Sequence, residues 1–291
     1  MSVNPAWAGM TRPGHSRGLL DVWSRRYLLR LLVRKDMQVR YRGSVLGWAW
    51  SYVKPAFQFL VYFIAMGVFL GLNKSLPNYP VYLFSGLVIM NYFNEAFMNS
   101  TRSVIDNTAL VKKIYLPREL FPVSSVIIAF VNFFPQLVVL MAAAILVGYH
   151  PTVLQVGFIL LSILIITILA MGLGLIFGAI NVSLRDSQNI VELIMMFTTW
   201  LSPVLYNAAL VDHVFPGWAL ILYNLNPITG AVGLIHLGAW APTTSQDPAT
   251  MALVGPHILI YGLAALVTSL VILLLGELVF RKLEKNFAQD L

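Results

Sequence analysis

The chain has 291 residues, of which 58% are hydrophobic and only 11% charged, and its formal net charge is +7. Soluble domains carry about 25% charged residues, so this composition excludes an ordinary soluble protein and indicates one embedded in a membrane. The lack of cysteine excludes disulfide bonds, thiol catalysis and cysteine-ligated zinc.

The segment before the first apolar stretch has two parts. Residues 1–18 contain arginine and proline but no apolar core, so we expect a flexible tail. Residues 19–54 are expected to form a cytoplasmic interface helix and a lead-in to the first span. Arg26, Arg30 and Arg34 recur there at four-residue spacing beside an apolar stripe. Two interpretations stay open: a basic anchor on anionic lipid, and a helix that also braces a cytoplasmic partner.

The rest of the chain, residues 55–276, contains six mostly apolar stretches. About 20 such residues are needed to cross a membrane as a helix, and barrel strands would alternate in polarity, which these stretches do not. We therefore predict an all-α integral membrane fold with six transmembrane helices, an N-terminal interfacial helix and short re-entrant gate helices between spans five and six. The spans are expected at about 55–73, 78–101, 120–147, 153–180, 191–211 and 256–276, before a cytoplasmic tail at 277–291.

The lysines and arginines orient these spans. Of the 19, only Lys74 falls outside the segments that the six-span arrangement places on one side. Cytoplasmic loops of membrane proteins are enriched in these residues, so both termini are expected in the cytoplasm. Because the basic residues flank apolar spans, we expect contact with membrane lipid and no binding of nucleic acid.

Polar residues within span two share one helical face. Asn91, Glu95, Asn99 and Arg102 follow helical spacing in its cytoplasmic half. A polar seam against a neighbouring helix is favoured over substrate contact, and both remain open. The sequence contains no P-loop and no HExxH pattern, and its five histidines follow no ligand spacing. No series of buried acids indicates ion coupling, so we expect the energy for transport to come from another chain.

Two connecting segments do not resemble simple loops. Residues 102–119 place the apolar Ile114, Tyr115 and Leu116 among charges, which indicates either docking or a solvated connector. Residues 212–255 are apolar but broken by prolines, and they contain no lysine or arginine. Such backbone must be buried in protein or line a wet cavity, so re-entrant pieces are expected there, with interfacial anchoring by tryptophan and tyrosine as the alternative.

Several motifs in collinear order resemble one family. The run from Arg40 to Pro55 resembles the R-Y-x-x-S-x-L-G-x-x-W-x-x-x-x-P signature of ABC-2-type polysaccharide exporter permeases, the Wzm-like subunits that export O-antigen, teichoic acid or galactan. Four later segments are similar to motifs of that family: Leu116–Ser124, Asn181–Asp186, Leu201–Tyr206 and Asn226–Ile228.

The resemblance implies partners and roles for these segments. It implies a homodimer of this chain with two copies of a separate P-loop ATPase, which binds ATP and magnesium, while this chain holds no cofactor or metal. It places the complex in a bacterial plasma membrane, with a lipid-linked polysaccharide as substrate. The coupling helix would contain Lys112, Lys113, Ile114, Tyr115, Leu116, Pro117, Arg118 and Glu119, and the gate helices Trp218, Tyr223, Asn226, Pro227 and Trp240.

A sliding sugar polymer needs weak, repeated contacts, which aromatic faces can supply by stacking on sugar C–H faces. For each candidate, anchoring in lipid or at the membrane interface is the alternative. The candidates for lining the path are Trp48, Trp50, Tyr52, Phe57, Tyr62, Tyr92, Phe93, Trp200 and Tyr206.

Two other functions fit the sequence less well. One is an exporter of a drug or small lipid from the same superfamily. The other is a membrane-embedded transferase acting on a lipid-linked sugar, which should show a cluster of acidic residues or histidines at the membrane surface. The sequence shows no such cluster. Among the glycans, a galactan is our first expectation.

Overall fold

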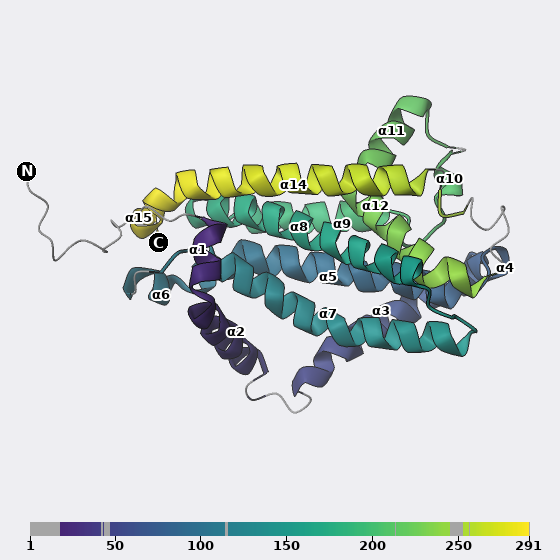
Figure 1. Cartoon of the computed structure of the whole chain (residues 1–291), viewed down its shortest axis with the longest axis horizontal. Coiled ribbons are helices and arrows are strands. Elements are labelled where there is room, and N and C mark those ends of the chain that lie inside the picture. Colours follow the sequence, from purple (N-terminus) through teal and green to yellow (C-terminus); the bar gives the residue numbers. More distant parts are fainter. Residues whose placement is uncertain are drawn as a thin grey trace, which may run out of the picture.

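Long helices lying side by side along one axis form the body of the protein (Figure 1). The computed structural model describes residues 18–41, 43, 47–113, 116–212, 214–244, 253–255 and 257–290, and this part of the chain forms helices and turns without any strand. The long helices are α3 (Trp50–Tyr62) continued by a π-helix (Phe63–Phe69), α5 (Tyr79–Asp106), α7 (Leu120–Leu146), α8 (Val153–Ser183) and α14 (Ile258–Leu283).

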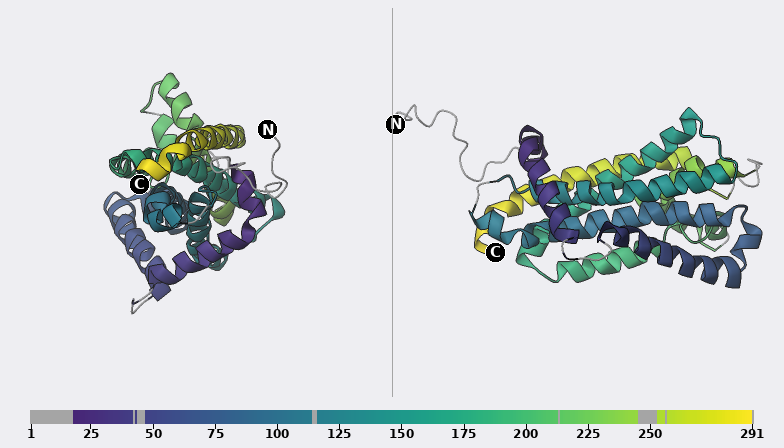
Figure 2. Two further views of the ribbon diagram at one scale, coloured as in Figure 1. Left: turned by 90° about the vertical axis from the view of Figure 1, so that its left-hand side faces the viewer. Right: turned by 90° about the horizontal axis from the view of Figure 1, so that it is seen from below.

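Shorter helices gather at the two ends of this bundle. One of them, α2, runs across the long helices rather than along them (Figure 2). Both ends of the described chain lie at the same end of the bundle, whereas Lys74 lies at the opposite end (Figure 1). The helices at the first end are α1 (Leu19–Ser24), α2 (Arg26–Tyr41), α6 (Thr108–Lys113) and α15 (Phe287–Asp290), and those toward the other end include α4 (Leu72–Ser75), α10 (Ala209–Asp212), α11 (Gly217–Leu225) and α12 (Pro227–Ile235).

Two segments differ from the expectation. The interface helix expected within residues 19–54 is two helices, because the chain breaks at Arg25 between α1 and α2. The expected tail at 277–291 begins with the last turns of α14. A 3-10 turn (Glu284–Asn286) and α15 follow, so this segment is folded.

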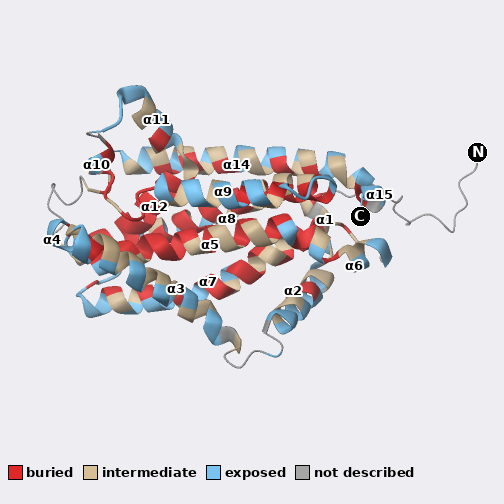
Figure 3. Cartoon of the chain, turned by 180° about the vertical axis from the view of Figure 1, so that it is seen from behind, coloured by how far each residue is buried: buried red, intermediate tan, exposed pale blue. Residues whose placement is uncertain are grey.

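Helix α5 forms the centre of the bundle. It packs against α7, α8, α9 (Ser187–Trp200) and α12, and its Tyr82, Phe93 and Phe97 are fully buried. Buried residues concentrate along α5, whereas the outer faces of α3, α9 and α14 are exposed (Figure 3). A helix surrounded by other helices has little contact with lipid, so α5 can carry polar residues that an outer helix could not.

In the described part of the chain, four helices are long and apolar enough to cross a membrane, fewer than the six expected. They are Trp50–Phe69, Leu120–Leu146, Val153–Ser183 and Ile258–Asn286, and the pair Gly217–Leu225 and Pro227–Thr243, bent by 72°, adds a fifth if counted as one span. The fifth expected span, 191–211, is not a single helix. Helix α9 ends at Trp200 after 14 residues, too few to cross alone, and the chain then turns through Ser202–Asn207.

Glycines let α8 and α14 approach until their backbones touch. A Cβ atom added to Gly276 would overlap the carbonyl of Gly172, and one added to Gly172 would lie 2.7 Å from the backbone nitrogen of Leu273. Small residues at such contacts drive association of helices in membranes, where the hydrophobic effect between helices is absent.

Replacing Gly276 with alanine is expected to destabilise the protein by about 1–3 kcal/mol, because the added methyl group overpacks a contact between two backbones. The control is Gly157→Ala on α8, where a Cβ meets nothing within 4 Å and should stabilise the helix by about 0.5–1 kcal/mol. Thermal unfolding in detergent measures both. Equal shifts of the melting temperature would contradict the assigned contact.

Candidate functional site

We call the end of the bundle that carries α1, α2, α6 and α15 the basic end. A polar cleft lies where α2, α3, α5 and α7 meet. Its volume is about 500 Å³. It is unusual in holding an ion pair and several amides in a chain that is otherwise strongly apolar. The cleft is lined by Arg40, Gly47, Trp50, Ser51, Lys54, Pro55, Asn91, Glu95 and Gln136.

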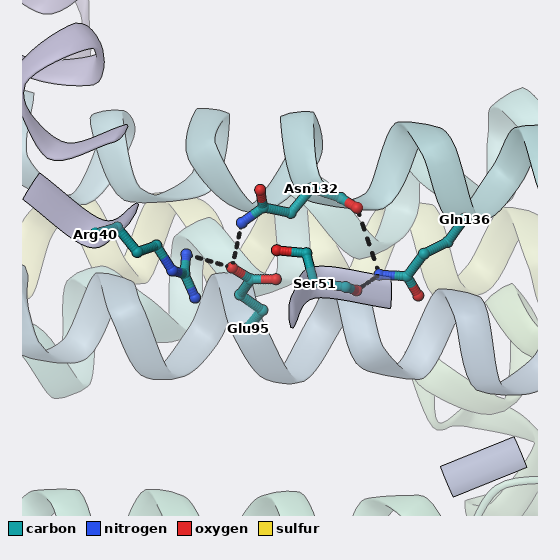
Figure 4. Close-up of polar contacts among 5 residues, drawn as sticks. All are labelled: Arg40, Ser51, Glu95, Asn132 and Gln136. Atoms are coloured by element: carbon teal, nitrogen blue, oxygen red, sulfur yellow. Dashed lines mark hydrogen bonds and ion pairs between the residues drawn. The ribbon is translucent and has the colours of Figure 1, made fainter. Parts of the chain in front are cut away.

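The carboxylate of Glu95 is the centre of this polar group. Arg40 Nη1 on α2 donates to Glu95 Oε1 at 2.5 Å, and Asn132 Nδ2 on α7 donates to the same oxygen at 2.7 Å (Figure 4). Glu95, one of the four residues on the polar face expected in span two, therefore pairs with neighbouring helices. Asn91 and Glu95 also line the cleft, so the same face borders open space.

A proline in α3 explains why Gln136 belongs to this polar group. Pro55 has no N–H, so the carbonyl of Ser51, four residues earlier, loses its helical partner. Gln136 Nε2 on α7 lies 3.5 Å from that carbonyl and 3.4 Å from the carbonyl of Asn132 (Figure 4). The side-chain amide of Gln136 thus donates to the carbonyl of Ser51 and connects α3 to α7.

Two groups in the cleft are suited to bind a ligand. Gln136 is only 6% exposed, and its Oε1 has no hydrogen-bond partner in the described part of the chain. A buried amide oxygen accepts well from a hydroxyl donor such as a sugar supplies. Lys54 is exposed at the cleft and forms no ion pair among the described residues. The cleft can therefore accept hydroxyl groups and an anion.

A second, smaller cleft of about 330 Å³ lies closer to the basic end, between α2 and the end of α5. Lys35 Nζ donates to Asn107 Oδ1 at 2.6 Å and also pairs with Asp36 at 3.1 Å. Burial raises the pKa of the Asp106 carboxyl, Arg102 opposes this shift, and Asp36 adds to it. These contacts attach α2 to α5, which fixes one wall of the larger cleft.

The structure separates the aromatic candidates into exposed and buried groups. Trp50 lines the polar cleft, and Phe57 and Trp200 are exposed elsewhere on α3 and α9. Tyr92 and Phe93 are buried in the core, so neither can touch a substrate in this conformation. Tyr52, Tyr62 and Tyr206 are partly buried, and the side chain of Trp48 lies outside the described residues.

The residues expected for coupling lie at the basic end. Lys112 and Lys113 are exposed at the end of α6, while Ile114 and Tyr115 lie outside the described residues. Leu116 is partly buried, Pro117 and Glu119 are buried, and Arg118 contacts the segment after α14.

The basic residues of the interface segment face outward. Arg26, Arg30 and Arg34 on α2 are all exposed, and so are the neighbouring Trp23 and Tyr27. A helix that exposes both arginine and aromatic side chains suits the surface of a membrane.

The expected gate region is attached to the rest of the protein by buried side chains and hydrogen bonds. Trp218 on α11 is exposed, but Tyr223 is buried and Trp240 is fully buried. Trp240 Nε1 donates to the carbonyl of Pro77 at 2.8 Å, and Asn226 caps α12 by accepting from the N–H of Ile228, next to Pro227.

Known proteins identify the family. Residues 27–236 match the family described as ABC-2 type transporter. The chain belongs to the ABC-2 type transporter family. Two proteins named O-antigen export system permease protein RfbA, both from Klebsiella pneumoniae, are 32% and 28% identical to it, covering 68% and 91% of this chain and 74% and 95% of the relatives. A protein of the same name from Myxococcus xanthus is 31% identical over 64% of this chain and 70% of its own length.

Membership of the ABC-2 family confirms the resemblance carried by the sequence motifs. The chain is a multi-pass membrane protein and a transport subunit, as the apolar helices also indicate. Within the described residues, no group of three or more histidine, aspartate or glutamate side chains could hold a metal ion.

Sequence reasoning missed two residues of this ABC-2 chain that shape the cleft. Asn132 and Gln136 are single amides inside a long apolar run, where they carry no charge to attract notice. Their four-residue spacing places both on one face of α7. That spacing, next to Pro135, is the signal from which they could have been found.

Proposed function

We propose that two copies of this chain form the membrane path of an ABC exporter that moves a lipid-linked polysaccharide out of the cytoplasm. Two copies of a separate P-loop ATPase bind ATP and Mg²⁺ below them, in a bacterial plasma membrane. The names of the relatives support a polysaccharide of the O-antigen type, and a galactan is the first glycan to test.

The observation that carries the proposal is the polar cleft. A glycan presents many hydroxyl donors and apolar C–H faces. Gln136 Oε1 is an acceptor without a partner, and the ring of Trp50 offers a face for stacking at the same cleft. Lys54 provides a positive charge suited to the phosphate of a lipid carrier. A small apolar drug would form neither hydrogen bonds nor ion pairs with these polar groups.

The proposed topology has six crossings with both termini in the cytoplasm. The two ends of the described chain lie together at the basic end, which requires an even number of crossings. Helix α5 would cross the membrane surrounded by its neighbouring helices. Helix α9, too short to cross alone, would form a further crossing together with the turn that follows it. Helices α11 and α12 would form the re-entrant gate.

The exposed faces of α3 and α9 support the proposed homodimer. Both helices contact α5, and both turn exposed faces outward (Figure 3). In α3 and its continuation, only 6% of the span is buried within the single chain, leaving Phe57, Leu60 and Val61 exposed. These faces are available to lipid and to the second copy.

The test is ATP-driven export by the complete complex. The chain purified alone should hydrolyse no ATP, and the complex with its ATPase should hydrolyse ATP and export surface polysaccharide in the native host. A host whose ATPase lacks the P-loop lysine should accumulate the glycan inside the cell. Normal surface polysaccharide in cells that lack this chain would overturn the proposal.

A further inference from the structure

The short segment after α14 is packed into the protein. Phe287 is fully buried, and its ring packs edge-on against that of Phe280 at 5.4 Å between centroids. Ser183 Oγ, at the end of α8, donates to Asp290 Oδ2 at 2.7 Å. The buried residues of the cluster around Phe287 come from α5, α8 and α14: Val104, Leu175, Ala179, Val182 and Phe280.

Arg118 connects this segment to the residues expected to contact the ATPase. Its guanidinium carbon lies 5.5 Å from the centroid of the Phe287 ring, a cation–π contact. Its Nη1 donates to the backbone carbonyl of Glu284. Arg118 stands five residues after the exposed Lys113, in the segment that leads into α7.

We infer that Glu284–Asp290 forms a clasp, which we call the α15 clasp, that makes the coupling segment and α14 move as one body. Arg118 and Phe287 are its positioning residues. The inference rests on the proposed function and on the expectation, from the family resemblance, that the ATPase contacts residues 112–119.

The covalent chain explains why such a link is needed. A force applied at Lys113 passes along the chain to α5 on one side and to α7 on the other. Helix α14 has no covalent neighbour at this end of the bundle except the α15 clasp itself. Through Arg118, the force reaches α14 directly rather than through the packed core.

Spin labels can test the clasp, since the chain has no cysteine of its own. Lys113→Cys places one label on the exposed end of α6, and Asn286→Cys places the other on an exposed residue of the α15 clasp. The complete complex, diluted with unlabelled chain, is measured with and without a non-hydrolysable ATP analogue. One narrow distance that nucleotide does not change is expected.

Three variants then separate positioning from folding. Phe287→Leu keeps an apolar side chain but removes the ring. Arg118→Gln removes the cation. Each should lower the ratio of closed to open clasp about two- to five-fold, the equivalent of a cation–π contact of about 0.5–1 kcal/mol. The distance distribution should broaden, and export per ATP hydrolysed should fall while ATPase activity persists. Arg118→Lys keeps the cation and should keep the coupling. The matched control is Gln289→Ala, which changes an exposed residue of α15.

Narrow distances in all variants, with unchanged export per ATP, would overturn the clasp. So would a loss of abundance with an unchanged ratio of export to hydrolysis, since that result would make Phe287 purely structural. A wild-type complex that never exports polysaccharide would overturn the proposed function instead, and the distances would still decide the clasp.

Discussion

Cells carrying Glu95→Ala are expected to lose most export and part of the membrane abundance of the protein. Two donors, Arg40 and Asn132, converge on one carboxylate oxygen. Without it, the buried amide of Asn132 loses its acceptor, which costs about 1–3 kcal/mol. The contribution of Arg40 is smaller, because its side chain is 40% exposed and can return to water.

Two variants distinguish a structural from a substrate-binding role at the cleft. Glu95→Gln retains an oxygen for Asn132 but loses the charge, so it should be intermediate. Arg40→Gln should have a smaller effect than Glu95→Ala if the ion pair is only a seam between helices. A larger loss of export for Arg40→Gln, at normal abundance, would contradict that order and indicate that Arg40 contacts the substrate. Surface polysaccharide and immunoblots of membranes measure both quantities.

Long helices were the most predictable part of the fold. Charged residues and turn residues bound them in sequence, so the expected spans 120–147 and 153–180 lie close to α7 and α8. Helix α5 begins at Tyr79, where span 78–101 is expected to begin, and continues beyond that span to Asp106, with Arg102 and Asp106 of its last turns exposed. Composition and turn signals identify such elements without knowledge of their neighbours.

Features that depend on distant neighbours were not predictable. Residues 191–211 are apolar throughout most of their length, so nothing local predicts that α9 ends at Trp200. Phe287 is a single aromatic residue in a polar stretch, and its burial depends on α8, α14 and Arg118. The pairing of Gln136 with the carbonyl freed by Pro55 joins residues 85 positions apart, from Ser51 to Gln136.

Two tyrosines of helix α5 stabilise the turn that follows α9. Backbone in irregular structure within a membrane needs hydrogen-bond partners from the protein. The hydroxyl of Tyr82 lies 2.8 Å from the carbonyl of Pro203 and 2.7 Å from that of Tyr206, and the hydroxyl of Tyr79 donates to the carbonyl of Leu205 at 3.2 Å. Tyr82 also stacks on the buried ring of His236, at 3.9 Å between centroids. The turn and the gate region are thus both attached to the same end of α5.

Replacing Tyr82 with phenylalanine should destabilise this turn by about 1–3 kcal/mol, because it removes the single hydroxyl donor that the carbonyls of Pro203 and Tyr206 share. The ring should still stack on His236. Tyr79→Phe is the matched control on the same helix. It removes one longer hydrogen bond to Leu205, so it should cost only about 0.5–1.5 kcal/mol.

Hydrogen exchange of the amides of residues 204–207 measures the turn directly. Exchange there should rise about five- to 150-fold in Tyr82→Phe, which corresponds to about 1–3 kcal/mol, while exchange in α8 stays unchanged. Equal effects of the two substitutions would show that ring burial, rather than the paired carbonyls, holds the turn. Unchanged exchange in both would mean that the turn is stabilised by the chain around Ser202 itself.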